Sequence, residues 1–354
     1  MDLENTLASH LSQISPPNMA LAESAAKREA SLAKPPGSLG RLEGLAIQLA
    51  AIQSSSKPRH ENKLMVVCAA DHGVVEEGVS PYPQSVTRQQ IENFSKGGGA
   101  ITTLCATAGV RVILLDVGVN FDFKDKPGVI NKKIAFGTKN LAKGPAMTRD
   151  EAIQSVLTGI EVVLAQPHLD LVAAGEMGIG NTTPSSCICC VYTGLSPEAA
   201  TGKGSGLDND RIAHKVSVVR KALDLNKPNP VDPIDVLAKV GGLEIGAMTG
   251  VYLGAAIRRA GIVIDGFIAA AAATLAEKLS PGISRYFIAG HRSQEPAHQA
   301  FLDHLRLKPL LDLNMWLGEG SGAAIAMFVA QCAVNHFNEM RTLEEASIDD
   351  PVEV

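Results

Sequence analysis

The sequence predicts an α/β protein with an open, doubly wound and mostly parallel sheet, preceded by a peripheral helical segment. Three features favour this fold class. From about residue 62, short runs of β-branched and aliphatic residues recur, a loop with Gly, Asp or Glu follows each run, and most loops lead into a helical pattern. Nearly continuous apolar runs are typical of parallel strands that are covered by helices on both faces.

The N-terminal segment, residues 1–57, has a helical pattern. Apolar residues recur at helical spacing over residues 39–52, which predicts a helix there. Pro35 and Pro36 exclude the preceding stretch from a helix interior, and Ser38 is a candidate N-cap. We therefore expect one large α/β domain with a smaller helical element at its N-terminal side.

Five apolar runs are candidate strands, at residues 64–70, 110–115, 169–174, 262–264 and 286–289. In an open parallel sheet, ligands bind beyond the carboxyl ends of the strands, so the residues after each run are candidate site residues. These are Asp71-His72-Gly73, Asp116-Val117-Gly118, residues 175–183, Asp265-Gly266 and residues 290–293, with a further glycine-rich loop at 317–322. Glycines and polar groups are expected to meet at this edge.

The charge and the apolar content of the chain argue against two classes of binding partner, nucleic acids and membranes. The 354 residues carry 32 basic and 37 acidic side chains, a net charge of −5, which argues against a nucleic-acid binder. The most apolar stretch, residues 262–276, is interrupted by Asp265 and too short to cross a bilayer. The N-terminus lacks the pattern of a signal peptide, so we expect a cytoplasmic protein that binds neither nucleic acid nor membrane.

The six cysteines are expected to be buried free thiols, as is usual in a cytoplasmic protein of this size. Cys187, Cys189 and Cys190 form a cluster that suggests a metal site. No second Cys or His pair follows at a spacing typical of zinc, so no metal and no cofactor are expected.

Glu319 lies in the loop Gly318-Glu319-Gly320-Ser321-Gly322. The alternating glycines allow close approach of a ligand and positive φ, and the helix that follows offers free N–H groups. A carboxylate held there is suited to accept a proton. The alternative is a tight turn with an ordinary charge at a helix start, and spacing alone does not decide between them.

Glu176 follows another candidate strand, in a glycine-rich segment where Asn181 or Thr182 is a candidate helix cap. The segment lacks the full G-x-G-x-x-G spacing, so a nicotinamide-dependent oxidoreductase is weakly indicated. Glu176 is a candidate site residue, with a structural salt bridge as the alternative.

Further candidate site residues carry basic or imidazole side chains. Lys203 lies among glycines, and Arg211 and Lys215 are four residues apart on an expected helix, a spacing suited to a phosphate but also common on solvated faces. His72 follows a strand and is equally well explained as a structural residue.

Eight segments of the sequence, taken together, resemble a known family. They are residues 34–43, 70–74, 175–184, 226–230, 239–242, 248–250, 265–267 and 317–324. Over nearly the whole chain and in this order, the sequence resembles the nicotinate-nucleotide–dimethylbenzimidazole phosphoribosyltransferases, which act in the assembly of the nucleotide loop of cobalamin.

The resemblance implies a homodimer whose small helical domain is formed from both ends of each chain. It implies residues 1–60 and 321–354 as that domain and residues 61–320 as the Rossmann-like catalytic domain. The implied substrates are nicotinate mononucleotide and 5,6-dimethylbenzimidazole, and the products are nicotinate and α-ribazole 5′-phosphate.

Site residues are implied in the same way. Glu319 matches the catalytic base, Glu176 matches a second acidic residue near the reacting sugar and base, and Lys215 and Ser293 match positions near the phosphate. The full set of expected substrate-binding residues is Tyr82, Gln90, Asp71, His72, Gly178, Asn181, Thr182, Lys215, Asp265, Ser293, Gly318 and Gly320.

The implied chemistry suits these residues. A pyridinium leaves as a neutral ring nitrogen without an acid, so one base suffices, and Glu319 would take the proton that the incoming azole loses. Inversion from the β to the α anomer predicts a single displacement without a covalent intermediate. Burial would raise the pKa of Glu319 and a helix N-terminus would lower it, and the sequence does not decide which prevails.

Tyr82 departs from the family pattern, in which the enteric enzymes carry a small Ser, whereas Gln90 matches it. We therefore hypothesise that the preferred base differs from dimethylbenzimidazole, for instance a hydroxylated benzimidazole, adenine or a phenol. Two other functions stay open: a nucleotide-binding oxidoreductase, and a non-catalytic protein that binds a nucleotide or an aromatic base.

Overall fold

The computed structural model describes residues 2–124, 126–204, 206 and 209–349. The strands are β1 (Lys63–Ala70), β2 (Arg111–Gly118), β3 (Val129–Asn131), β4 (Leu171–Met177), β5 (Gly261–Ile264) and β6 (Phe287–Ala289). The α-helices are α1 (Leu3–Leu11), α2 (Met19–Ser31), α3 (Arg41–Gln53), α4 (Ser85–Phe94), α5 (Ala100–Ala108), α6 (Arg149–Leu164), α7 (Thr182–Thr193), α8 (Pro197–Ala200), α9 (Asn209–Asn226), α10 (Pro233–Val240), α11 (Leu243–Ile257), α12 (Phe267–Leu279), α13 (His298–His304), α14 (Ser321–Glu339) and α15 (Leu343–Ala346). Short 3₁₀ helices span Gly73–Glu77 and Ile283–Tyr286.

The sheet confirms the predicted fold class. Its order is β3-β2-β1-β4-β5-β6, and every neighbouring pair is parallel. The five predicted strands are present, with ends that differ by up to three residues. The short edge strand β3 was not predicted, because three partly exposed residues carry no apolar run. The strand order reverses between β1 and β4, the point where open α/β sheets bind ligands.

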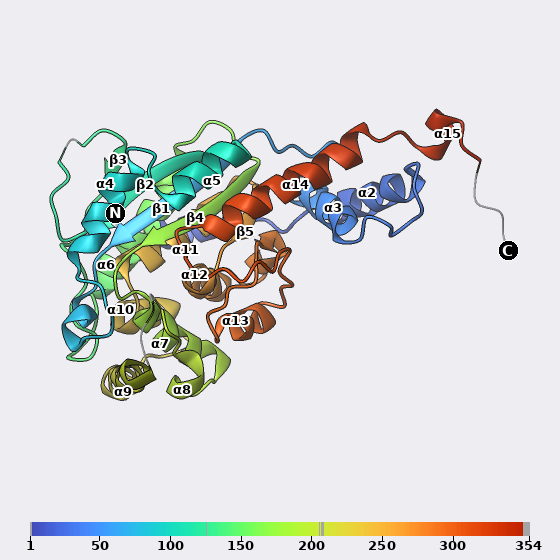
Figure 1. The fold of residues 1–354 in the computed structure, drawn as a ribbon. Helices are drawn as coiled ribbons and strands as arrows, with labels where there is room; N and C mark the ends of the chain where they lie inside the picture. Colours follow the sequence, from blue (N-terminus) through green and yellow to red (C-terminus); the bar gives the residue numbers. More distant parts are fainter. Residues whose placement is uncertain (1, 125, 205, 207–208, 350–354) are drawn as a thin grey trace.

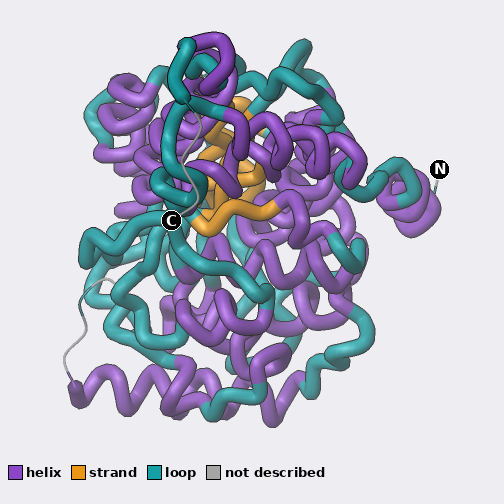
Figure 2. Tube along the Cα trace, turned by 90° about the vertical axis from the view of Figure 1, so that its right-hand side faces the viewer, coloured by secondary structure: helices purple, strands orange, loops and turns teal. Residues whose placement is uncertain are grey.

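Helices cover both faces of the sheet, which is why the strands read as continuous apolar runs (Figures 1 and 2). Along β1, Leu64, Val66 and Cys68 pack with α6, α11 and α12 on one face. Met65 and Val67 alternate with them and pack with α3, α5 and α14 on the other. The core therefore has two layers, one on each side of a central sheet.

The terminal segments do not all lie together. Helix α1 packs against α6, whereas α2 and α3 pack beside α14, which extends away from the sheet (Figure 1). Lys34 links these elements, since its ammonium pairs with Glu29 at 3.1 Å and Glu43 at 2.7 Å. The division of the chain at residues 60 and 320 stays a prediction.

The expected helix at residues 39–52 is α3, shifted by one or two residues. The expectation that Ser38 caps it is wrong. The N-cap is Gly40, at φ +55°, and the Ser38 amide closes a turn by donating to Pro35. The turn that follows the two prolines brings Gly40, and not the hydroxyl group of Ser38, to the start of α3.

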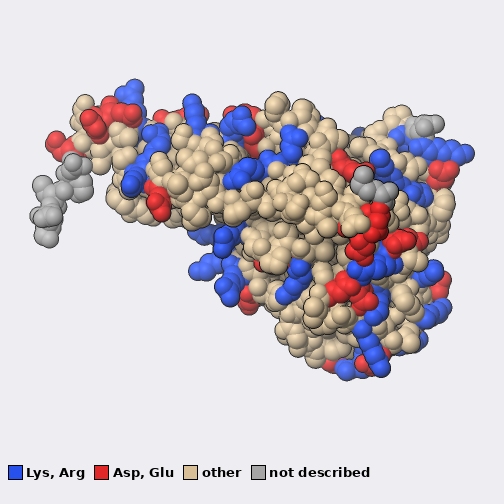
Figure 3. Space-filling view, turned by 180° about the vertical axis from the view of Figure 1, so that it is seen from behind, with Lys and Arg blue, Asp and Glu red and all other residues tan. Residues whose placement is uncertain are grey.

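The surface shows mixed charge. On the face seen in Figure 3, acidic and basic side chains lie close to one another over most of the charged areas. Within the described part of the chain, every helix falls short of the length and apolarity that a membrane crossing requires.

Candidate active site

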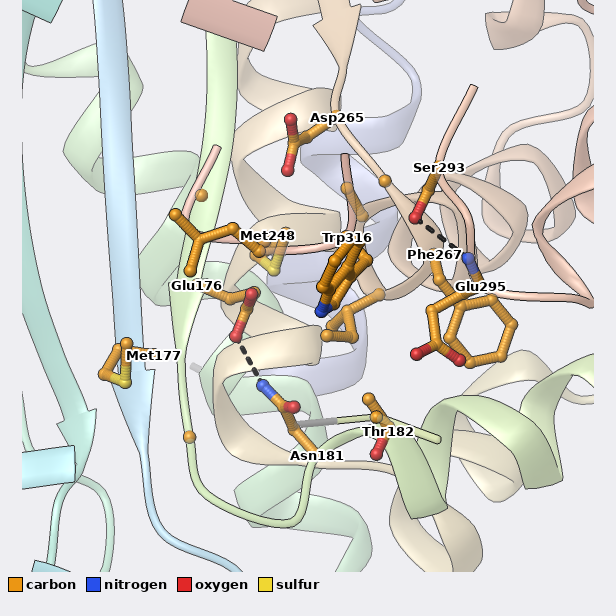
Figure 4. Close-up of a pocket in the computed structure, with 18 of the residues that line it drawn as sticks. Glu176, Met177, Asn181, Thr182, Met248, Asp265, Phe267, Ser293, Glu295 and Trp316 are labelled. Atoms are coloured by element: carbon orange, nitrogen blue, oxygen red, sulfur yellow. Dashed lines mark hydrogen bonds between the residues drawn. The ribbon is translucent and has the colours of Figure 1, made fainter. Parts of the chain in front are cut away.

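A pocket opens at the carboxyl ends of β4, β5 and β6, on the edge that the sequence predicted (Figure 4). Glu176 comes from the end of β4, Asp265 follows β5, and His291 and Ser293 follow β6. The loop between α13 and α14 closes one side with Trp316, Leu317 and Gly318. Residues far apart in the sequence therefore meet because parallel strands end at one edge.

Glu176 is a buried acid of this pocket and is held by two hydrogen bonds. Its side chain is 7% exposed, Asn181 Nδ2 donates to Oε2 at 2.5 Å, and the amide of Glu319 donates to Oε1 at 3.1 Å. Burial raises the pKa of Glu176 to about 7, and the two hydrogen bonds oppose that shift only in part. The carboxyl group is therefore poised to change its charge near neutral pH. Asn181 is the N-cap residue of α7, but its side chain bonds Glu176 instead of the helix.

Glu319 lies between two glycines with positive φ and itself has φ +63°. A Cβ at Gly175 would come within 2.0 Å of the Glu319 carbonyl oxygen, so this loop requires glycine on the neighbouring strand. Its carboxyl group is buried, and Oε2 accepts from the Ile101 amide in the first turn of α5 at 3.4 Å. Glu319 does not line the pocket, but its backbone bonds Glu176.

The effect of burial on the pKa of Glu319 is larger than the opposing effect of a helix terminus. Desolvation raises the pKa of this carboxyl group, the bond from Ile101 lowers it less, and the charge of Asp265 raises it further. The helix that faces the carboxylate is α5, not α14, which follows Glu319 in the sequence. A proton acceptor with a raised pKa is a stronger base than a free carboxylate.

Asp265 holds the start of α14. Its two carboxylate oxygens accept from the amides of Gly320, at 3.2 Å, and Ala323, at 2.9 Å. His291 Nε2 lies 3.6 Å away, and burial raises the pKa of Asp265. Although Asp265 lines the pocket, its oxygens already fix the loop that carries Glu319. The structure thus supports a positioning role more directly than the expected contact with substrate.

A cation is buried beside the pocket. Lys215, on α9, is 1% exposed, and its ammonium donates to Thr182 Oγ1 at 2.7 Å. Burial lowers the pKa of Lys215 to about 8, while Glu295 acts in the opposite direction. Thr182, Ser293 and Glu295 line the pocket, and the Glu295 amide donates to Ser293 Oγ at 3.3 Å (Figure 4). Hydroxyl groups and an ammonium thus gather at one end, as a phosphate requires.

Asp71 and His72 are buried but lie outside the pocket lining. His72 is fully buried, and its Nε2 lies 2.6 Å from Glu244 Oε1. A Cβ at Gly178 would come within 3.1 Å of that imidazole nitrogen, so the His72–Glu244 pair packs closely against the loop after β4. Asp71 Oδ2 accepts from the Asn120 amide at 2.7 Å. The buried pair with Glu244 favours the structural alternative for His72, and a direct contact of Asp71 or His72 with substrate stays a prediction.

Tyr82 and Gln90 lie outside the pocket lining. Tyr82 is 50% exposed, and its amide donates to the hydroxyl of Ser80, which does line the pocket. Gln90, on α4, accepts from Asn93 Nδ2 at 3.3 Å. Their roles in binding a base stay predictions.

The expected set therefore divides by position. The predicted residues that line the pocket are Glu176, Gly178, Asn181, Thr182, Asp265, Ser293 and Gly318. Lining residues absent from the expected set include Ser80, Met177, Met248, Phe267, Glu295, Trp316 and Leu317. Most of these adjoin segments that the sequence had singled out, so proximity to those segments was the available signal.

The expectation of buried free thiols is confirmed for Cys68, Cys105, Cys187 and Cys189, but it is wrong for Cys332, which is exposed, and Cys190 is only half-buried. Cys187 and Cys189 are buried in α7, and burial raises the pKa of Cys189 to about 11 and that of Cys190 to about 12. The described residues contain no group of three His, Cys, Asp or Glu side chains arranged to hold a metal ion.

Comparisons with known proteins agree with this geometry. A family model described as phosphoribosyltransferase matches residues 14–348. The nicotinate-nucleotide–dimethylbenzimidazole phosphoribosyltransferase of Desulforudis audaxviator is 50% identical over 340 residues, 96% of each chain. The protein of that name from Chloroflexus aurantiacus is 46% identical over 99% of this chain and 100% of its own.

Solved structures extend the likeness to three dimensions. CobT from Thermus thermophilus superposes with a TM-score of 0.90 at 43% identity, over 94% of this chain and 100% of its own. A second structure from that organism, described as this phosphoribosyltransferase, gives a TM-score of 0.89 at 42% identity. Sequence, fold and the acidic strand-end site agree, and the chain belongs to this family of phosphoribosyltransferases.

Proposed function

We propose that this enzyme transfers the phosphoribosyl group of nicotinate mononucleotide to 5,6-dimethylbenzimidazole or a related base. The products are α-ribazole 5′-phosphate and nicotinate, and the step belongs to cobalamin biosynthesis. Relatives at 45–50% identity over nearly full length carry the name of this activity. The observation that carries the proposal in this chain is the pair Glu176 and Glu319, joined through a 3.1 Å hydrogen bond at the predicted ligand-binding edge.

The reaction is a single displacement at the anomeric carbon. A nitrogen of the incoming base forms the new bond as the bond to the pyridinium nitrogen breaks, and the electron pair of that bond stays on the departing nicotinate. The other nitrogen of the azole loses a proton, which passes to the carboxylate of Glu319. Proton transfer of this kind typically contributes about 10²- to 10⁴-fold in rate.

Glu176 acts on the sugar. In its ionised form it stabilises the positive charge that develops on the ribose as the bond to nicotinate breaks. Asn181 and the Glu319 amide hold its two oxygens, which keeps the carboxylate in one orientation. The ammonium of Lys215, with the hydroxyl groups of Thr182 and Ser293, supplies the charge and donors for the phosphate.

The test mixes the purified protein with nicotinate mononucleotide and dimethylbenzimidazole and follows nicotinate and ribazole phosphate by chromatography and mass. We expect both products only when both substrates are present. A protein that releases no nicotinate with any base would contradict the proposal. A tight complex with a nicotinamide dinucleotide in its place would favour the oxidoreductase alternative.

Competition between bases tests the Tyr82 hypothesis. Clear preference for dimethylbenzimidazole over hydroxylated benzimidazoles, adenine and phenols would contradict it, and Tyr82→Ser measures the contribution of that side chain. The homodimer and the cytoplasmic location are part of the same proposal. Light scattering in solution is expected to give twice the mass of one chain.

A further inference from the structure

Trp316 is the sole tryptophan of the chain, and it lies at the mouth of the pocket. Its side chain is 63% exposed, which is unusual for so large an apolar group. In the view of Figure 4, its ring lies between Glu176 on one side and Phe267 and Ser293 on the other. Among the described residues, none stacks on the indole, places a cation over it or accepts from its N–H.

The backbone on both sides of Trp316 is fixed. The Met315 carbonyl accepts from the Gln294 amide at 3.0 Å, and the Glu319 amide donates to Glu176 at 3.1 Å. The ring is therefore carried by an anchored loop while its own faces have no partner among the described residues. An exposed aromatic ring on an anchored backbone is pre-organised to contact a ligand at little entropic cost.

The charges of the lining favour a cationic ring. Glu176, which Figure 4 draws beside the indole, contributes a carboxyl group, and among the described residues no Lys or Arg belongs to the lining. Lys215 is a cation that neighbours the pocket, and it bonds Thr182 at the end assigned to phosphate. Indole is the best of the protein rings for attracting a cation to its face, and the attraction strengthens where water is excluded. A pyridinium ring fits this wall with its positive nitrogen over the indole and its carboxylate directed through the open mouth of the pocket toward solvent, away from Glu176.

We propose that Trp316 covers the pyridinium ring of nicotinate mononucleotide by a cation–π contact, an assignment that rests on the proposed function. When the bond to the anomeric carbon breaks, the electron pair neutralises the ring nitrogen and the contact weakens. Trp316 therefore binds the substrate ring more tightly than the product ring, which eases release of free nicotinate after the bond has broken but does not lower the barrier to bond breaking. A single displacement places the incoming base opposite the leaving ring. The proposal places the incoming base on the α5 side, where Glu319 Oε2 accepts from the Ile101 amide, and nicotinate on the Trp316 side.

Because Trp316 is the only tryptophan, fluorinated tryptophan incorporated during expression changes this position alone. Fluorine withdraws charge from the ring face but keeps its shape. We expect the Kd of nicotinate mononucleotide, measured by calorimetry, to rise with the number of fluorines, while that of nicotinate stays unchanged. Equal affinities for all the fluorinated proteins would overturn the cation–π assignment.

Substitution gives an independent measure. Trp316→Leu is expected to raise the Kd of nicotinate mononucleotide about tenfold, the equivalent of about 1.4 kcal/mol, and Trp316→Phe less. The KM of the base should change less than about twofold, since the base lies on the other side. Phe136→Leu is the control, because Phe136 is 61% exposed and lies outside the pocket lining.

Two outcomes would overturn this inference without touching the proposed function. One is a wild-type enzyme that forms product while Trp316→Leu leaves the Kd of the nucleotide unchanged. The other is a rise in the KM of the base alone, which would assign Trp316 to the incoming ring. Failure of the wild type to form product would instead count against the proposed function, and the binding measurements would still report whether Trp316 contacts the nucleotide.

Discussion

Replacing Glu176 with glutamine removes a buried acid whose pKa, at about 7, lies well above the ordinary value of 4.5. Because the folded protein holds this proton more tightly than the unfolded chain, the stability associated with it is fully present below pH 4.5. It is lost as the pH rises from about 4.5 to 7. The glutamine side chain keeps the size of the carboxyl group and has no charge to desolvate. Asn181 can rotate its amide to offer an oxygen to the new NH₂ group.

The expected size follows from the shift. One pKa unit corresponds to about 1.36 kcal/mol, so the free energy of unfolding of Glu176→Gln relative to wild type should rise by roughly 2.5 kcal/mol between pH 5 and pH 8. Urea unfolding followed by circular dichroism at both pH values measures this change. Turnover of wild type should increase as the pH rises through about 7, and the variant should lack that inflection. A stability difference that is independent of pH would refute the assignment of the raised pKa to Glu176.

Three further substitutions test other parts of the site. Glu319→Gln should lower kcat by about 10²- to 10⁴-fold with the Kd of nicotinate mononucleotide retained, and an unchanged kcat would exclude it as the base. Lys215→Met should raise the KM of nicotinate mononucleotide about 10- to 100-fold. In wild type the affinity should fall above pH 8, where the ammonium loses its proton; constant affinity to pH 9 would argue against a phosphate contact. Gly175→Ala should displace the Glu319 backbone and lower both kcat and the melting temperature, whereas the control Gly44→Ala, with nothing within 4 Å, should keep kcat and stabilise α3. Equal behaviour of the two alanine variants would contradict the requirement for glycine beside Glu319.

The sheet was predictable because its strands obey a local rule. A strand buried on both faces has to be apolar along its length, so β1, β2, β4, β5 and β6 stood out in the sequence. Strand β3 did not, because its three residues lie at the edge and are partly exposed. The start of α3 was misassigned for a similar reason, since the glycine that begins it has a positive φ that no periodicity reveals.

The site was predictable only in outline. Residues at or soon after the strand ends, such as Glu176 and Ser293, were found because the fold dictates where strand ends meet. The side-chain directions were not available. Glu319 points toward α5, Asp265 bonds the amides of the α14 terminus, and His72 pairs with Glu244, and each contact joins segments distant in the sequence. Trp316 was missed although it adjoins the glycine-rich loop at 317–322, because no sequence pattern marks an exposed ring as part of a pocket.

The course of the displacement offers the most direct test of the account. Nicotinate release would be measured with and without the base in a single turnover, and the anomeric configuration of the product determined by NMR. A single displacement predicts no nicotinate release without a base and an α-configured product. A burst of nicotinate in the absence of base, or a β-configured product, would indicate a covalent or stepwise route and contradict the roles given to Glu319 and Glu176.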